Sequence, residues 1–391
     1  MNPDTVIASA GRLAGHQNNF DLIRLFAAAQ VAYLHIVKNL EIELSLIPEL
    51  MRSIFEYFPG VPIFYVTSGY LISASYRRDG NLKRYLVSRF LRIYPALWIC
   101  TGLTLLAILL LAHDQSTDAG ASGIPSGAIV KWMVAQVTIG QFYAPFSIRQ
   151  AFGVGHPNGS LWTIPVELQF YLLLPFIIIF IDRTTKAGNR STREIIFFGI
   201  VILLAWMHVL GHPGLNRWNE SMAVLARVTV FPYLYMFGLG ILLQSSWPRI
   251  ERFVRGKFFL WLGLYCGASL LFWHAFGISA NSNTPNLITM SILAVTILAA
   301  AYSKPTLTAT LLRGNDISYG IYIYHMVIVN VIFELAYTPT FALGMTAMAI
   351  TVLTAMLSWF LIERPALRLK SRVAPRMIGP QTGSARAAAS P

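Results

Sequence analysis

The chain has 391 residues, of which 55% are hydrophobic and only 12% are charged, and its formal net charge at pH 7 is +13. A typical soluble domain carries about 25% charged residues, so this composition excludes an ordinary soluble protein. The positive charge does not indicate nucleic-acid binding, because the basic residues stand in short segments between apolar runs, which is the positive-inside pattern of membrane proteins.

Apolar runs of the length of a bilayer crossing, about 20 residues, recur along almost the whole chain. The ten clear runs are Phe20–Val37, Ile54–Tyr76, Phe90–Ala112, Ser160–Ile181, Ile195–Leu210, Val224–Leu243, Phe258–Phe276, Leu287–Tyr302, Ile317–Tyr337 and Phe341–Ile362. They predict an all-α fold, a polytopic transmembrane helical bundle. The two cysteines, Cys100 and Cys266, lie inside such runs, which predicts neither a disulfide framework nor a metal site.

The charges between the runs predict how the helices are oriented. Segments rich in Lys and Arg belong in the cytoplasm. The basic segments are Arg77–Arg92, Asp182–Glu194, Ser246–Lys257 and the tail after Ile362. Their assignments agree only if an eleventh apolar segment, Ala128–Gln141, which is shorter and contains Lys131, does not cross the membrane. We therefore expect ten spans with both termini cytoplasmic, and an interfacial or re-entrant segment at 128–141.

Three parts of the chain follow from this topology. Residues 1–19 form a polar cytoplasmic N-terminus without the charged-then-apolar order of a signal peptide, so the first span also serves as the targeting signal. Residues 20–365 form the transmembrane domain. Residues 366–391 form a basic cytoplasmic tail, and its richness in Ala, Ser, Pro and Gly predicts disorder.

Arg24 and His35 are ionisable residues within the first span. Each such group costs about 2.5–3.5 kcal/mol in a membrane span and is therefore a functional candidate. They share one helix face, separated by ~16 Å along the axis, with Arg24 in the inner half and His35 near the outer end. The structural alternative is that Arg24 reaches the inner headgroups and His35 caps a neighbouring carbonyl.

Arg89 and Arg92 form an Arg-x-x-Arg pair where a basic segment enters the third span. The arginine fork matches phosphate oxygens bidentately, so the pair is a candidate phosphate site. The alternative is a positive-inside anchor, and the spacing alone does not decide between the two.

Two further ionisable residues lie within later spans. Glu167 enters the membrane from the outer side, and a buried carboxylate needs a partner or a proton. It is a candidate to orient an imidazole such as His35, or it forms a structural ion pair. His325 lies mid-span between aromatic residues, and we interpret it as a packing residue, with catalysis as the alternative.

Six segments, in this order, resemble the acyltransferase-3 family of integral membrane proteins over roughly Phe20 to Pro365. They are Phe20-Asp-Leu-Ile-Arg-Leu-Phe-Ala-Ala with Tyr33-Leu-His, Phe64-Tyr-Val-Thr-Ser-Gly-Tyr-Leu-Ile, Arg89-Phe-Leu-Arg-Ile-Tyr-Pro, Ser160-Leu-Trp-Thr-Ile-Pro-Val-Glu-Leu-Gln-Phe-Tyr, Ser318-Tyr-Gly-Ile-Tyr-Ile-Tyr-His and Phe360-Leu-Ile-Glu-Arg-Pro. The departures are modest: Gln30 lies in a usually apolar helix, and Thr163 and Pro165 replace commoner residues.

The resemblance implies an O-acyltransferase, usually an acetyltransferase, of extracytoplasmic glycans and some small molecules, in the bacterial inner membrane. It assigns the essential histidine to His35, places Arg24, Arg89 and Arg92 on the donor side, and gives Glu167 a supporting role. The expected partners are acyl-CoA, such as acetyl-CoA, a glycan or other hydroxyl acceptor, and membrane lipids. No tightly bound cofactor, metal or nucleic acid is expected.

Two mechanisms fit these residues. His35 acts as a general base on the acceptor hydroxyl, or it forms an acyl-histidine intermediate. Ser68, Ser160 and Trp162 are the candidate oxyanion donors. The main rival function is a secondary transporter or flippase that uses Arg24, His35 and Glu167 as a proton or substrate path. Transporters often show a repeat between their halves, and this sequence shows none.

Overall fold

The structure, a computed structural model, describes residues 18–112, 124–184, 196, 199–201, 203, 225–278, 283–335 and 337–373. Every regular element in these ranges is helical, and they contain no strand, so the predicted all-α fold class is confirmed. Most of the N-terminal segment, most of the run Ile195–Leu210 and most of the C-terminal tail lie outside the described residues.

The α-helices follow the apolar runs of the sequence in chain order. They are α2 (Phe20–Asn39), α3 (Glu49–Tyr57), α4 (Gly60–Asp79), α5 (Leu82–Leu111), α6 (Ser126–Val137), α7 (Phe146–Ala151), α8 (Thr163–Thr184), α11 (Leu234–Val254), α12 (Phe258–Phe276), α13 (Leu287–Tyr302), α14 (Leu307–Leu312), α15 (Ser318–Glu334), α16 (Phe341–Ser358), α17 (Arg364–Arg368) and α18 (Lys370–Val373). Short 3-10 turns span Leu44–Leu46 (η1), Gly159–Trp162 (η2) and Phe231–Tyr233 (η4), and a π-helical turn (η5) spans Trp359–Glu363.

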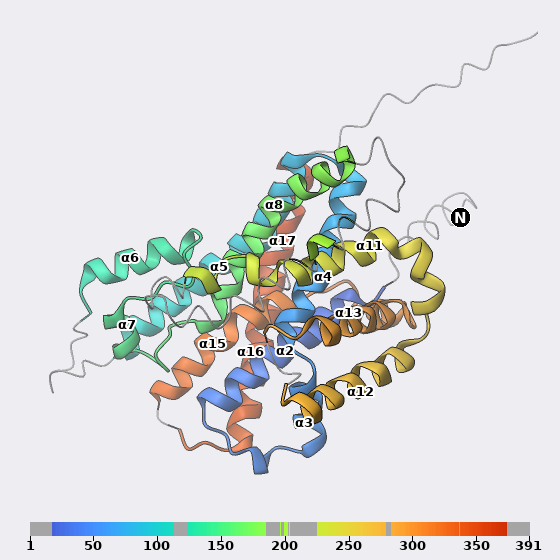
Figure 1. The fold of residues 1–391 in the computed structure, drawn as a ribbon. Coiled ribbons are helices and arrows are strands. Elements are labelled where there is room, and N and C mark those ends of the chain that lie inside the picture. Colours follow the sequence, from blue (N-terminus) through green and yellow to red (C-terminus); the bar gives the residue numbers. More distant parts are fainter. Residues whose placement is uncertain are drawn as a thin grey trace, which may run out of the picture.

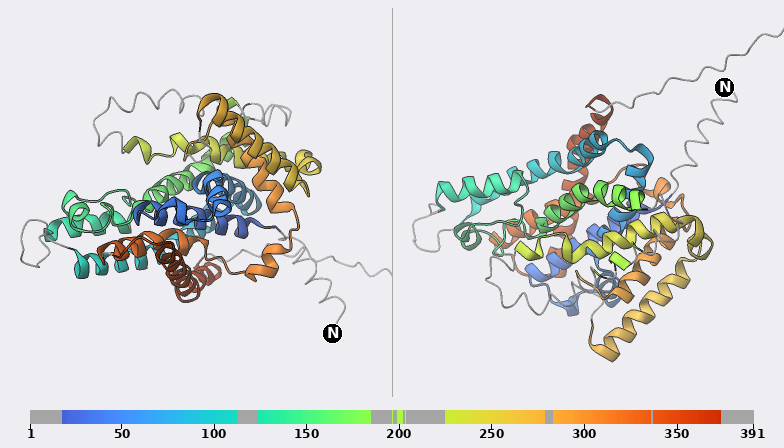
Figure 2. Two further views of the ribbon diagram at one scale, coloured as in Figure 1. Left: turned by 90° about the horizontal axis from the view of Figure 1, so that it is seen from below. Right: turned by 45° about the horizontal axis from the view of Figure 1, so that its top comes forward.

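The helix α2 lies at the centre of the bundle (Figure 1). It packs between α4 and α15, which in turn pack on α11 and on α5 and α16. The peripheral elements α6 and α7 lie beside the outer end of α5, whereas α12 lies on the opposite side of the molecule against α13 (Figure 2). The first span is therefore positioned to bring its polar residues next to those of several other spans.

Glycines allow α4 and α11 to approach closely. A Cβ atom at Gly69 would lie 2.2 Å from the carbonyl oxygen of Phe237, and one at Gly240 would lie 2.2 Å from that of Val66. Without a hydrophobic drive between helices in lipid, membrane proteins rely on such small residues for close packing. The two glycines therefore set the position of α4, which forms one wall of the site described below.

The structure explains why the polar residue Gln30 occurs in the otherwise apolar first span. Its side chain is buried, and its amide nitrogen donates to the carbonyl oxygen of Phe55 at 2.9 Å. Its amide oxygen accepts from the backbone N–H of Gly60 at 2.8 Å. These bonds satisfy the two backbone groups where the chain passes from α3 to α4, since a buried unpaired polar group would cost about 1–3 kcal/mol.

Six helices of the described part of the chain are long and apolar enough to cross a membrane. They are Phe20–Asn39, Leu82–Leu111, Gly159–Phe180, Leu225–Val254, Phe258–Phe276 and Phe341–Arg368. The helix α13 is a shorter apolar helix. The protein is thus a multi-pass membrane protein, and the count of ten spans with cytoplasmic termini stays a prediction.

The boundaries of several helices differ from those of the apolar runs. The helix α5 already begins at Leu82, and α11 continues to Val254, because Arg, Lys and Glu are good helix formers although they end an apolar run. The predicted continuous run Ile54–Tyr76 is broken, because α3 ends at Tyr57 and Phe58 is extended. The ring of Pro59 disfavours the helical conformation for the residue before it.

The segment predicted not to cross the membrane contains α6. Its 12 residues give a length of ~18 Å, against ~30 Å for the hydrocarbon core of a bilayer. The helix packs on α5 and buries Trp132 and Gln136. Its length therefore favours an interfacial or re-entrant position.

The topology predicts that cysteines placed on the two sides of this segment react from the same face of the membrane. In a protein with Cys100 and Cys266 replaced by alanine, Asp118→Cys and Ser147→Cys should both react with an impermeant maleimide added outside. Asn81→Cys, in a segment predicted to be cytoplasmic, should not react and is the control. Reaction of Asp118→Cys and Ser147→Cys from opposite faces would make the segment a span and reverse the orientation of everything after it.

Candidate active site

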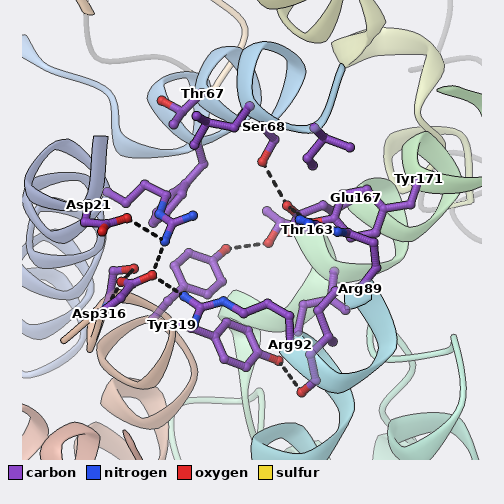
Figure 3. Close-up of a pocket in the computed structure, with 18 of the residues that line it drawn as sticks. Asp21, Thr67, Ser68, Arg89, Arg92, Thr163, Glu167, Tyr171, Asp316 and Tyr319 are labelled. Atoms are coloured by element: carbon purple, nitrogen blue, oxygen red, sulfur yellow. Dashed lines mark hydrogen bonds and ion pairs between the residues drawn. The ribbon is translucent and has the colours of Figure 1, made fainter. Parts of the chain in front are cut away.

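A cavity of about 360 Å³ opens between α2, α4, α5, α8 and the start of α15. This volume lies in the range of small-molecule sites, about 300–1,000 Å³. Its charged lining residues are Asp21, Arg24, Arg89, Arg92, Glu167 and Asp316 (Figure 3). The structure therefore brings together the three arginines that the sequence analysis placed on the donor side, Arg24, Arg89 and Arg92, with Glu167, which it gave a supporting catalytic role. We call this space the inner cavity.

The carboxylate of Asp316 joins the two deepest arginines. Its Oδ2 accepts from Arg24 and, at 2.5 Å, from Arg92 (Figure 3). Burial alone would raise the pKa of this carboxyl, but the charges of Arg24 and Arg92 hold it below its ordinary value. Asp316 is therefore a buried anion that links α2 to α5.

Asp316 was not a candidate in the sequence analysis. Its Oδ1 accepts from the backbone N–H of Ser318 at 3.2 Å and from the Ser318 hydroxyl at 2.5 Å. An Asp side chain that bonds the backbone two residues later forms an Asx turn, which favours a helix start. The signal was an aspartate directly before the apolar run Ile317–Tyr337, but nothing local revealed its arginine partners.

A second carboxylate, that of Glu363, approaches Arg92 at 3.6 Å. Glu363 is 1% exposed and lies in the π-helical turn Trp359–Glu363 at the end of α16. Such turns are rare and frequently occur at functional sites. The rings of Tyr319 and Trp359 each lie 5.9 Å from the Arg92 guanidinium. Arg92 is thus held by two carboxylates and two aromatic rings.

Arg89 has a different environment from Arg92. Its guanidinium lies 5.7 Å from the ring centre of Tyr171, and no hydrogen bond or ion pair joins it to another residue in the described part of the chain. Burial lowers the pKa of Lys370, and the positive charge of Arg89 lowers it further, so a second cation lies near this arginine. Arg89 is the cavity arginine whose positive charge is left for a ligand.

Glu167 accepts two hydrogen bonds within the inner cavity. The donors are the hydroxyl of Ser68, at 2.9 Å, and that of Tyr171 (Figure 3). Thr163, Glu167 and Tyr171 are spaced four residues apart on α8, so they share one helix face. No hydrogen bond joins Glu167 to His35 among the described residues, so the predicted role of Glu167 in orienting this imidazole has no contact behind it in this structure.

The partner of His35 is His325. The Nδ1 atom of His35 lies 2.7 Å from Nε2 of His325, whose own Nδ1 lies 3.1 Å from the carbonyl oxygen of Ile321. His325 is completely buried, and the interpretation that favoured a packing role, with catalysis as the alternative, did not anticipate this bond. The pair connects α2 to α15, 290 residues apart in the chain.

The histidine pair lies beyond the end of the inner cavity. The cavity-lining residues include Phe64 and Tyr322 but not His35 or His325. The rings of Phe64 and Tyr322 are 5.6 Å apart, and the Tyr322 ring is 6.2 Å from that of His325. Two aromatic side chains therefore separate the arginine-lined space from the histidines.

A second cavity, of about 400 Å³, lies among α6, η2 and the segment before α11, and we call it the outer cavity. Five aromatic side chains line it: Trp132, Phe142, Tyr143, Trp162 and Tyr233. Trp162, a predicted oxyanion donor, lines this space and not the inner one. In the described ranges, neither its indole N–H nor the Tyr143 hydroxyl has a hydrogen-bond partner.

The other predicted oxyanion donors are already engaged. Ser68 donates to Glu167, and the buried Ser160 donates to the Asn158 side chain at 2.8 Å. No group of three or more His, Cys, Asp or Glu residues able to hold a metal ion occurs among the residues described.

Comparisons with known proteins identify a family and several relatives of this chain. A family model described as an acyltransferase domain matches residues 17–363. Nodulation protein 10 of Rhizobium leguminosarum bv. viciae is 30% identical over 381 residues, which cover 93% of this chain and 97% of that protein. The O-acetyl transferase of Shigella phage Sf6 is 27% identical over 93% of this chain and 99% of its own length.

A larger relative matches over part of its length. The peptidoglycan O-acetyltransferase OatA of Listeria monocytogenes is 26% identical over 332 residues, 79% of this chain and 51% of that protein. No solved structure matches the chain significantly.

The charge network predicts that Asp316 is essential for stability. Asp316→Ala should lower the free energy of unfolding by about 3–5 kcal/mol, because it leaves Arg24 and Arg92 buried beside each other without their shared anion. Thermal unfolding of the purified protein in detergent measures this. The control is Asp21→Asn, which removes a half-exposed partner of Arg24 alone and should cost at most about 1 kcal/mol. Equal, small effects of both changes would contradict the assignment.

Proposed function

The chain belongs to the acyltransferase-3 family and is an acyltransferase, and from this premise we propose that it moves an acyl group, such as acetyl, from cytoplasmic acyl-CoA to a hydroxyl outside the inner membrane. The acceptor is proposed to be a glycan or lipid-linked saccharide. The observation that supports the proposal is the arginine-lined cavity, which ends near the hydrogen-bonded pair of His35 and the buried His325.

The donor is proposed to bind with its phosphates at Arg89 and its thioester pointing into the inner cavity. Arg89 supports this role because its guanidinium has no carboxylate partner in the described part of the chain, and the fork of an arginine matches phosphate oxygens. Lys370 adds positive charge near Arg89. Arg24 and Arg92, which Asp316 holds, shape the cavity and contribute to its field.

His35 is proposed to take the proton of the acceptor hydroxyl. The hydroxyl oxygen then attacks the thioester carbonyl, the carbon–sulfur bond breaks, and the released thiolate receives the proton from the imidazolium. Imidazole suits this task because its pKa is ordinarily near neutrality, and a positioned base contributes about 10²–10⁴ in rate. The partner of His35 on α15, described above, supports a fixed orientation of the ring.

The acceptor is proposed to approach through the outer cavity. Rings with free N–H and O–H groups, as at Trp162 and Tyr143, suit a ligand that presents both apolar faces and hydroxyls, such as a saccharide. The predicted topology puts this cavity on the external face. If Ser147→Cys reacted from the cytoplasmic face, the outer cavity would lie on the donor side and would be excluded as the acceptor site.

The donor proposal predicts different outcomes for the two neighbouring arginines. Arg89→Ala should weaken coenzyme A binding by about 1.5–3 kcal/mol, the range for hydrogen bonds to charged groups, while thermal stability stays near that of the wild type. Arg92→Ala should also lower stability, because it removes the cation that pairs with Glu363 and one of the two that pair with Asp316. Calorimetric titration in detergent, with Arg84→Ala on the same helix as the control, separates these effects.

Unchanged coenzyme A affinity of the folded Arg89→Ala protein would refute its role as phosphate anchor and leave it as a topology signal.

The catalytic proposal predicts that His35→Ala and His35→Gln both lose acyl transfer by at least ~100-fold while coenzyme A affinity is kept. An amide forms hydrogen bonds but does not take a proton at neutral pH. The measurement is the rate at which the radiolabelled acetyl group of acetyl-CoA appears on a membrane-associated acceptor. His274→Ala, at an exposed position on the peripheral α12, is the control. A His35→Gln protein with most of the wild-type activity would assign the base to another residue.

A further inference from the structure

We propose that His325 is a positioning residue, which holds His35 in the tautomer that carries its proton on Nδ1 and leaves Nε2 as the base. This inference rests on the proposed function of His35. It assigns a role to a residue that the sequence analysis interpreted as packing, with catalysis as the alternative.

The contact of His325 with the backbone determines which of its ring nitrogens carries the proton. Its Nδ1 atom lies 3.1 Å from the carbonyl oxygen of Ile321. A carbonyl oxygen has no proton to donate, so Nδ1 of His325 must be the donor in this bond. The ring is completely buried, and no carboxylate bonds to it among the described residues, so the neutral form is favoured. Its Nε2 therefore carries a lone pair.

The proton on His35 follows from that lone pair. Nε2 of His325 lies 2.7 Å from Nδ1 of His35, so His35 must donate here and its proton is on Nδ1. A neutral imidazole has one N–H, so Nε2 of His35 is then unprotonated. The bond thus selects one of the two tautomers of the ring.

The ring geometry supports a directed hydrogen bond. The two ring planes are inclined by 11°, with their centres 5.0 Å apart. Rings stacked face to face would be separated by about the van der Waals contact distance of 3.5–4.0 Å, so a nitrogen–nitrogen distance of 2.7 Å excludes stacking. The rings meet edge to edge in nearly one plane, where the lone pair of the acceptor lies.

His325 is itself held in place through α15. Before it, the hydroxyl of Tyr322 donates to the carbonyl oxygen of Ser160 at 2.8 Å. After it, the Asn330 side chain donates to the carbonyl oxygens of His156 and Pro157 at 2.9 and 2.8 Å. These bonds fix the helix on both sides of His325 to one segment of chain, which gives the support that a precise site requires.

The consequence for the reaction is a base with a defined direction. Nε2 is on the edge of the His35 ring away from Nδ1, so it faces away from His325. When it takes the hydroxyl proton, the Nδ1–H bond to His325 persists and stabilises the imidazolium. A nucleophile–base arrangement in which a third group orients the base is a general pattern, and here a neutral imidazole supplies the acceptor that a carboxylate often supplies.

The test compares the same substitution at the two positions. His35→Gln is expected to be inactive, whereas His325→Gln is expected to keep activity. His325→Gln places an amide oxygen near the position of Nε2 and still accepts from His35, so it should keep activity within about tenfold of the wild type. His325→Leu and His325→Met remove the acceptor and should lose at least ~100-fold in kcat, with the KM for acetyl-CoA unchanged. The assay supplies radiolabelled acetyl-CoA to membrane vesicles of producing cells, which contain the native acceptor.

Two results overturn the proposal. Activity of the folded Leu or Met variant equal to the wild type would make His325 a packing residue. Loss of activity in His325→Gln equal to that in His325→Leu would make His325 a proton-transferring group. Whichever of Leu and Met yields a folded protein, judged by thermal unfolding and by coenzyme A binding, provides the comparison.

A second measurement does not depend on activity. If the hydrogen bond exists, His35→Leu and His325→Leu should lower the melting temperature by less in combination than the sum of their single effects. Additive effects would refute the bond. Wild-type vesicles that transfer no label would refute the proposed acyl-CoA reaction instead, and the double-mutant comparison would still decide the pairing.

Discussion

The interaction on which the site depends is the shared carboxylate of Asp316. Two guanidinium groups in a membrane-embedded cavity repel each other and lose their hydration, so neither would be stable there alone. One buried anion between Arg24 and Arg92 removes this difficulty, and it does so at the point where α2, α5 and α15 meet. The position of α2 against α15 in turn brings His35 to His325. The charge network at one level of the bundle and the imidazole pair at another are thus two consequences of the same helix packing.

The same network explains why neighbouring arginines of one motif differ. Arg92 faces Asp316 and Glu363, whose position comes from a π-helical turn, while Arg89 faces the ring of Tyr171. Arg92 therefore serves as a structural cation, whereas the charge of Arg89, three residues earlier on α5, is available to a ligand. A spacing rule treats the two arginines alike, and only the surroundings that other helices bring to each of them distinguish their roles.

The sequence predicted much of this arrangement, and the limits have physical causes. Ionisable residues in apolar runs are costly, so Arg24 and Glu167 stood out without any structure, and both line the inner cavity. Asp316 precedes its span, where a carboxylate is ordinary, so nothing in the local pattern indicated its partners. The pairing of His35 with His325 joins residues 290 positions apart, and helix periodicity carries no information on such contacts. Pro59 indicated a break before α4, but a hydropathy average over the run Ile54–Tyr76 does not show it.

The separation of the two cavities bears on how transfer across a membrane could work. Six charged residues line the inner cavity, whereas Arg227 is the one Lys, Arg, Asp or Glu among the described residues that line the outer one. Between them stand Phe64 and Tyr322 on the inner side, and on the outer side Gly159, at which a Cβ atom would lie 4.0 Å from the Met326 side chain. An open path at this level would let water hydrolyse the thioester, since exclusion of water suppresses such side reactions. Under the proposed function, the aromatic pair and Met326 keep the two sides apart, so donor and acceptor meet only at the histidines, where the base is.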